Sequence, residues 1–224
     1  TPFWLGALMS IAAIVIIWKF SKETKKHPDH GKGFLHGMKS NWENPSLKKF
    51  YIAIFFLYFG LYAFWNCIGI YLQRGFGFST TKLAYVMAYD SFFFAIGLLF
   101  LVQRIAKKMK PFTTTGWAAF GLAIMLVILV VPESSWGLVM TIPPIGILIS
   151  ILMTNAAVMV SDAADDTSQG QALGTMQSIQ VLAGMFVGVI GGLLGALKPG
   201  LPLLAGAVMS AVCGYLLIRR RKHV

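Results

Sequence analysis

The chain has 224 residues, of which 57% are hydrophobic and only 12% are charged, and its formal net charge is +11. A soluble domain averages about 45–50% apolar and about 25% charged residues, so this composition excludes a disordered, collagenous, coiled-coil or ordinary cytosolic chain. The two cysteines, Cys67 and Cys213, lie in apolar stretches, which excludes a disulfide scaffold and a thiolate zinc site. The composition therefore predicts a polytopic integral membrane protein, and the lack of strand alternation in its apolar stretches predicts that it is all-α.

A helix needs about 20 mostly apolar residues to cross the hydrocarbon core of a bilayer. Seven stretches of the chain meet this requirement: Thr1–Phe20, Phe50–Leu72, Leu83–Val102, Thr113–Val131, Ser135–Val160, Ala172–Leu197 and Leu201–Ile218. We therefore predict seven transmembrane helices, of which the last six follow one another closely.

The basic residues predict the orientation of these helices. If residues 19–49 lie in the cytoplasm, only Arg74, Lys82 and Lys198 of the 19 Lys and Arg residues lie on the opposite side. The positive-inside rule expects this asymmetry, so the C-terminus is predicted to be cytoplasmic. The positive charge is thereby assigned to topology; the expected partner is the lipid bilayer and not nucleic acid.

Three segments organise the chain: a helix over residues 1–20, a basic cytoplasmic linker over 21–49 and a six-helix bundle over 50–224. The chain opens inside an apolar helix, without an initiator Met or a cleavage site. We therefore expect it to be the later part of a longer protein.

The linker contains His27, His30 and His36, which raises the question of a metal site. Pro28 prevents their regular presentation on a helix, and no thiol lies nearby. A solvated basic loop near anionic headgroups is the favoured interpretation, and no metal is expected.

Two short stretches resemble a known family. The turn Ile70-Tyr-Leu-Gln-Arg-Gly-Phe-Gly-Phe-Ser79 and the helix start Gln169-Gly-Gln-Ala-Leu-Gly174 are similar to the corresponding segments in the C-terminal half of a major facilitator superfamily transporter. The nearest resemblance is to the drug:proton antiporter branch that includes tetracycline-efflux-type proteins. The stretch Arg104-Ile-Ala-Lys-Lys-Met109 departs from the family's loop motif because it lacks its Gly and Asp.

This resemblance implies a twelve-helix fold of two six-helix halves, working by alternating access in the cytoplasmic (inner) membrane. Residues 1–20 would correspond to the sixth helix and residues 50–224 to the C-terminal bundle. The implied partners are a small-molecule substrate, protons and the missing N-terminal bundle of the same protein.

Asp90 is the one acidic residue placed well inside a predicted span. A carboxylate there costs about 2.5–3.5 kcal/mol on insertion scales, and such residues usually line a cavity or a proton path. We therefore predict Asp90 as the proton-coupling residue. The alternative is that the helix starts later and that Asp90 lies near the outer interface.

Polar and aromatic side chains at helical spacing suggest a substrate cavity. Tyr58, Tyr62 and Asn66 share one face of their helix, whereas Trp65 and Cys67 are expected to point elsewhere and to pack. An aromatic face with polar tips suits an amphipathic ligand, and ordinary packing is the alternative. Further candidates are Asn155, Gln177 and Gln180.

Prolines and glycines suggest moving and packing elements. Pro143 and Pro144 remove two backbone donors from one span, which predicts either a hinge for gating or a purely structural kink. Small residues four apart allow helices to approach closely. On this basis we predict helix-packing roles for Gly184, Gly188, Gly192, Gly206, Ser210 and Gly214.

No feature of the sequence supports an enzyme. The chain has no paired carboxylates, no intramembrane His, no nucleophile elbow and no phosphate-binding loop, so no catalytic residue and no cofactor is predicted. The predicted function is a proton-coupled transporter that exports a small amphipathic compound. The alternatives are an importer or facilitator of a small metabolite, and a non-transporting receptor or assembly subunit with the same fold.

Overall fold

The structure is a computed structural model that describes residues 2–20, 45–131, 135–165 and 168–220. It divides the chain into two compact units, Thr1–Lys32 and Gly33–Val224. In the first unit the described element is helix α1 (Pro2–Phe20), which is apolar along most of its length. At about 1.5 Å per residue, a 19-residue helix is close to the thickness of a hydrocarbon core.

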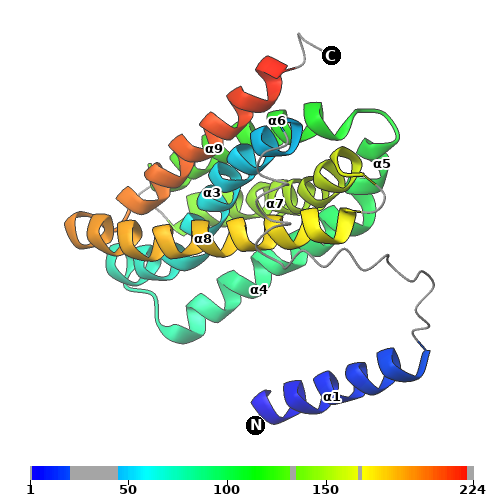
Figure 1. Cartoon of the computed structure of the whole chain (residues 1–224). Helices are drawn as coiled ribbons and strands as arrows, with labels where there is room; N and C mark the ends of the chain where they lie inside the picture. Colours follow the sequence, from blue (N-terminus) through cyan, green and yellow to red (C-terminus); the bar gives the residue numbers. More distant parts are fainter. Residues whose placement is uncertain (1, 21–44, 132–134, 166–167, 221–224) are drawn as a thin grey trace. The chain divides into compact units, whose positions relative to one another are not determined.

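The second unit is a bundle of long helices (Figure 1). Its elements are α3 (Pro45–Phe76), α4 (Thr80–Ile96), the π-helix η1 (Gly97–Val102), α5 (Gln103–Ala106), α6 (Pro111–Val130), α7 (Ser135–Ala163), α8 (Gln169–Leu197) and α9 (Leu201–Arg220). Because α4, η1 and α5 run on without a break, the bundle has six helices long and apolar enough to cross a membrane, counted over the described residues. With α1 as a shorter apolar helix, the prediction of an all-α membrane fold is confirmed.

The helix ends extend beyond the apolar stretches, because hydropathy marks only the part of a helix that would lie in hydrocarbon. Helix α3 begins at Pro45, where a missing N–H group costs no helical hydrogen bond. It ends before Gly77, whose φ of 64° is readily adopted only by glycine. Ser79 then caps α4 by accepting a hydrogen bond from the Lys82 N–H group at 3.4 Å.

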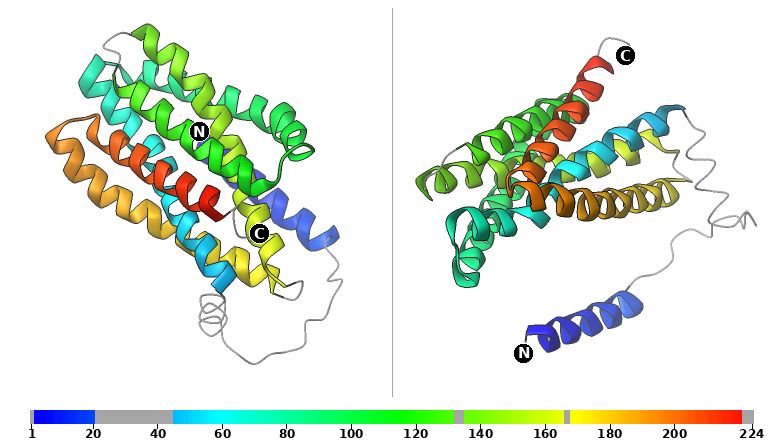
Figure 2. Two further views of the ribbon diagram at one scale, coloured as in Figure 1. Left: turned by 90° about the horizontal axis from the view of Figure 1, so that it is seen from above. Right: turned by 90° about the vertical axis from the view of Figure 1, so that its left-hand side faces the viewer.

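The six spans pack in a fixed order of neighbours (Figures 1 and 2). Helix α9 packs on α6 and α3, α3 also packs on α8, and α7 packs on α6 and α4. Helix α3 is therefore the most buried span. The two least buried spans are α8 and the one that consists of α4, η1 and α5. Any polar side chain on the inner face of α4 must find its surroundings mainly on α7.

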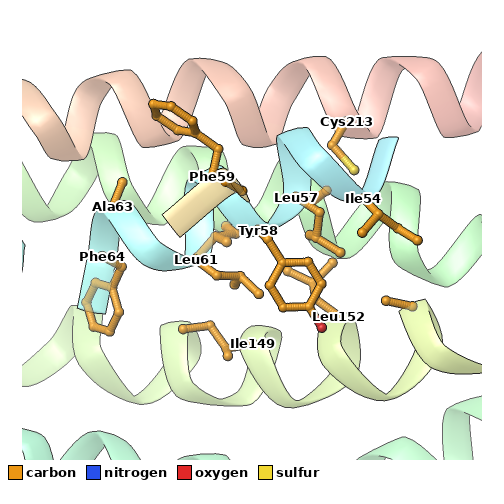
Figure 3. Packing of buried hydrophobic residues seen from close by; sticks show 14 of the residues in the cluster. Ile54, Leu57, Tyr58, Phe59, Leu61, Ala63, Phe64, Ile149, Leu152 and Cys213 are labelled. Atoms are coloured by element: carbon orange, nitrogen blue, oxygen red, sulfur yellow. The ribbon is translucent and has the colours of Figure 1, made fainter. Parts of the chain in front are cut away.

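The centre of the bundle is a continuous apolar core. Figure 3 shows Leu57, Leu61 and Phe64 of α3 facing Ile149 and Leu152 of α7, and all five are almost fully buried. Burial of such side chains does not drive association of helices in lipid as it does in water, so close packing and polar contacts must determine the register of the helices. The contacts of the polar residue Asp90 can therefore help to determine how α4 packs against its neighbours.

The contacts of α9 with α3 and with α6 show how small residues determine the distance between helices. A Cβ atom added to Gly206 would lie 2.6 Å from Ala63 Cβ of α3, and one added to Gly214 would lie 2.9 Å from the Gly116 carbonyl oxygen of α6. Ser210 lies between them, fully buried against Gly60 of α3. Any larger residue at these positions would push α9 outward.

Candidate functional site

The Asp90 carboxyl group is buried between helices. Its side chain is 5% exposed, and Oδ1 has no hydrogen-bond partner within the described chain. Helix α4 begins at Thr80, ten residues earlier, which places Asp90 about 15 Å along the helix axis at 1.5 Å per residue. A buried polar atom without a partner is costly, so this position is suited to a group that changes its partners or its protonation.

Helix α7 approaches Asp90 closely because residue 146 is a glycine. A Cβ atom added to Gly146 would lie 2.7 Å from the Asp90 carbonyl oxygen and 3.0 Å from Oδ1. The same atom would lie 3.1 Å from the Phe94 nitrogen, one turn further along α4. Only a residue without a side chain lets the two backbones come together at this point.

The contact between α4 and α7 extends in both directions from Asp90. Towards the start of α7, the Tyr89 hydroxyl group donates a hydrogen bond to the Val139 carbonyl oxygen at 3.4 Å. Towards its end, Gly97 packs on Ser150, and a Cβ atom added to Gly97 would lie 3.2 Å from Ile147 Cα. The π-helix η1 begins at this Gly97, and π-segments of this kind often occur at functional sites.

On the other side, the Trp65 side chain of α3 interacts with the Asp90 carboxyl group. The expectation that Trp65 points away from the aromatic face was wrong: its ring lies edge-on to Tyr62, with centroids 6.2 Å apart. Trp65 follows Tyr62 by three residues and Tyr58 by seven, which places all three on one side of a helix. This spacing was the signal in the sequence that the prediction missed.

The aromatic side chains continue from Trp65 to α8. The Tyr58 and Tyr62 ring centroids are 6.0 Å apart, and Tyr62 lies over Gly184. Tyr58 is 3% exposed, and its side chain interacts with that of Gln180. Asp90 and Gln180, on the two least buried spans, are thus joined through a line of aromatic rings on α3.

The remaining cavity candidates are Asn66, Asn155 and Gln177. Asn66 of α3 and Gln177 of α8 are exposed. Asn155 is 7% exposed on α7, two and a half turns beyond Gly146 at about 3.6 residues per turn. The structure therefore brings together Asp90, Tyr58, Tyr62 and Gln180 through Trp65, whereas cavity roles for the other three stay predictions.

The predicted hinge and packing residues fall in two groups. Pro143 and Pro144 lie within α7, which stays helical on both sides of them, between the contacts of Tyr89 and Asp90. Among the glycines of α8 the closest contact is at Gly191, where an added Cβ atom would lie 2.9 Å from Cys67 Sγ. Added Cβ atoms at Gly188 and Gly192 would have no neighbour within 4 Å, so packing roles for these two stay predictions.

The histidines of the linker lie outside the described residues. Within the described chain, no group of three or more His, Cys, Asp or Glu side chains is placed to hold a metal ion.

These observations define a multi-pass helical membrane protein with an ionisable side chain buried in one of its spans. The sequence matches the family model of the Major Facilitator Superfamily over residues 1–188 and over residues 51–224, which together cover the whole chain. The chain therefore belongs to the Major Facilitator Superfamily and to its membrane transporters. Comparison with individual curated proteins gave no match.

Proposed function

We propose that this chain forms part of a secondary active transporter that couples the export of a small amphipathic compound to the movement of protons. The observation that carries the proposal is the Asp90 carboxyl group, buried in α4 with an unpartnered oxygen atom. Buried charges normally pair with opposite charges or are neutralised. A proton is the simplest species that can neutralise this carboxylate.

The aromatic side chains next to Asp90 support an amphipathic substrate. Trp65, Tyr62 and Tyr58 offer apolar ring surface, with an indole N–H and hydroxyl groups at their edges. Such side chains can bind the apolar body of a ligand while the Gln180 side chain interacts with its polar groups. The resemblance to drug:proton antiporters favours export over uptake of a metabolite.

The driving force would come from the proton gradient. Moving one charge across a membrane potential of 100 mV releases about 2.3 kcal/mol, before any pH difference is added. In alternating access, Asp90 would bind its proton from one side of the membrane and release it to the other.

We also propose that the partner of this bundle is a second six-helix bundle of the same protein, placed in the cytoplasmic membrane. A facilitator site lies between two bundles, so the chain alone should bind a substrate weakly and should not transport it. Co-expression of the chain with that bundle should restore transport. Robust uptake by the purified chain alone would contradict this arrangement.

Asp90→Asn tests the coupling, because the amide keeps the shape and polarity of the carboxyl group and does not carry a titrating proton. In vesicles that contain the complete transporter, we expect gradient-driven accumulation of an amphipathic substrate to fall at least tenfold, a change of about 1.4 kcal/mol in the driving step. Exchange of labelled for unlabelled substrate without a gradient should stay near wild-type.

Asp162→Asn, which alters an exposed carboxylate at the end of α7, is the matched control and should leave accumulation unchanged. Normal accumulation by Asp90→Asn would exclude Asp90 as the proton carrier. Transport that equilibrates the substrate without accumulating it, even in wild-type protein with a pH gradient, would favour a facilitator, and a lack of any transport would favour a receptor or assembly subunit.

A further inference from the structure

The two adjacent prolines of α7 leave a gap in its backbone hydrogen bonds. In an α-helix each N–H group donates to the carbonyl group four residues earlier, and proline has no N–H group. Pro143 therefore leaves the Val139 carbonyl group without its helical donor, and Pro144 does the same for Met140. Inside a membrane an unsatisfied carbonyl group costs several kcal/mol, so a donor from another helix is valuable there.

Helix α4 supplies a donor for the first of these carbonyl groups. The Tyr89 hydroxyl group lies 3.4 Å from the Val139 oxygen, a long hydrogen bond that crosses from α4 to α7. The Tyr89 ring is held edge-on by Phe93, with centroids 5.0 Å apart. A side chain of α4 thus takes the place of the N–H group that Pro143 lacks.

The next residue of α4 contacts α7 on the other side of the proline pair. Val139, which accepts from Tyr89, precedes Pro143 by four residues. Gly146, which contacts Asp90, follows Pro143 by three residues. Positions four and seven residues apart share one side of a helix, so Val139, Pro143 and Gly146 all face α4. Two consecutive residues of α4 therefore hold α7 on both sides of its two prolines.

We infer that Tyr89 is a positioning residue for transport: its hydroxyl group fixes the proline-interrupted part of α7 against α4, so that a change at the Asp90 carboxyl group alters the bend of α7. This inference rests on the proposed function of Asp90. The groups placed against Asp90 are Trp65 of α3 and Gly146 of α7, and neither carries a charge. A rearrangement at Asp90 can therefore reach α7 directly through Gly146, while Tyr89 holds the other side of the prolines in place.

The hydrogen bond itself can be tested without transport. Tyr89→Phe removes only the hydroxyl oxygen, and Pro143→Ala gives residue 143 an N–H group for the Val139 carbonyl group. In thermal unfolding of the purified protein in detergent, Tyr89→Phe should lower the midpoint in the wild-type background. It should have little or no effect in the Pro143→Ala background.

Pro144→Ala is the matched control, because it supplies a donor for Met140 and leaves Val139 dependent on Tyr89. Tyr89→Phe should keep its full effect in that background. If Tyr89→Phe lowers the unfolding midpoint equally in the Pro143→Ala and Pro144→Ala backgrounds, the Tyr89 hydroxyl group does not replace the donor that Pro143 lacks. Tyr85→Phe, which alters an exposed tyrosine one turn earlier on α4, should change nothing in either background.

The positioning role needs a second measurement, the initial rate of substrate exchange as a function of substrate concentration. We expect Tyr89→Phe to lower the maximal rate about two- to tenfold, the range supplied by one hydrogen bond, and to leave half-saturation unchanged. An unchanged maximal rate would overturn the positioning role even if the unfolding cycle showed the hydrogen bond. Because exchange needs no gradient, a failure of proton coupling at Asp90 would appear separately, as normal accumulation by Asp90→Asn.

Discussion

Gly146 shows how one missing side chain determines a functional contact. Its Cα hydrogen takes up the space in which any other residue would place a Cβ atom, and that atom would lie 2.7 Å from the Asp90 carbonyl oxygen. Backbone cannot move away as a flexible side chain can, so α4 and α7 would have to separate. The glycine is therefore a requirement for the buried position of Asp90.

We predict that Gly146→Ala destabilises the bundle by about 1–3 kcal/mol, the usual cost of overpacking. Gly188→Ala is the control, because an added Cβ atom there has no neighbour within 4 Å. It should be neutral or stabilising by up to about 1 kcal/mol through helix propensity. Thermal unfolding in detergent measures both variants, and equal stability of the two would contradict the close contact at Gly146.

The sequence predicts some residues of the site and not others, for a physical reason. Asp90 could be found because a charge inside an apolar span stands out against its surroundings. Tyr89 and Gly146 could not be found from the sequence, because tyrosine and glycine are common in membrane helices. Their roles depend on which residues of the neighbouring helix they contact. Trp65 lies beside Tyr62 on α3, although a face that runs through Tyr58, Tyr62 and Asn66 leaves it out.

At the scale of the helices, side chains of α3 satisfy the carbonyl groups that neighbouring helix ends leave free. The last four carbonyl groups of a helix have no N–H partner within it. The Tyr71 hydroxyl group donates to the Leu129 and Val130 carbonyl oxygens at the end of α6, at 3.2 and 3.4 Å. Arg74 donates to the Gly195 carbonyl oxygen near the end of α8 at 3.3 Å.

Tyr71→Phe should therefore lower the free energy of unfolding by about 0.5–1.5 kcal/mol, because it removes a donor from two carbonyl groups and leaves the ring in place. Tyr215→Phe, at an exposed position on α9, is the matched control and should fall within about 0.5 kcal/mol of wild-type. Thermal or denaturant unfolding in detergent distinguishes them. A loss as large for Tyr215→Phe would show that the hydroxyl group of Tyr71 has no special role.

The number and order of the helices follow from the hydropathy of the sequence, whereas the π-segment inside the second span of the bundle does not. Each apolar stretch of the second unit became a helix because, in lipid, the backbone must satisfy its own hydrogen bonds. The π-segment Gly97–Val102 has no hydropathy signature and was predicted as ordinary helix. It begins where Gly97 packs on Ser150 of α7, a contact between distant parts of the chain that no local pattern in the sequence records.

At the scale of the whole bundle, charge and helix direction are related. The span from Thr80 to Ala106 is 27 residues long, about 40 Å at 1.5 Å per residue, so its two ends would lie on opposite sides of a membrane. Exposed Arg104, Lys107 and Lys108 gather at its far end, and Ser79 lies exposed at its start. The distribution of basic residues predicts that the far end is cytoplasmic.

Single-cysteine labelling tests this orientation. The native Cys67 and Cys213 are 6% and 0% exposed, so they should contribute little background. Treating intact cells with a membrane-impermeant maleimide should label Ser79→Cys and leave Lys108→Cys unlabelled, because of these two positions only Ser79 would face outward. Inside-out vesicles should give the reverse result. Labelling of Lys108→Cys in intact cells would invert the predicted topology, and Asp90 would then be reached from the opposite side of the membrane.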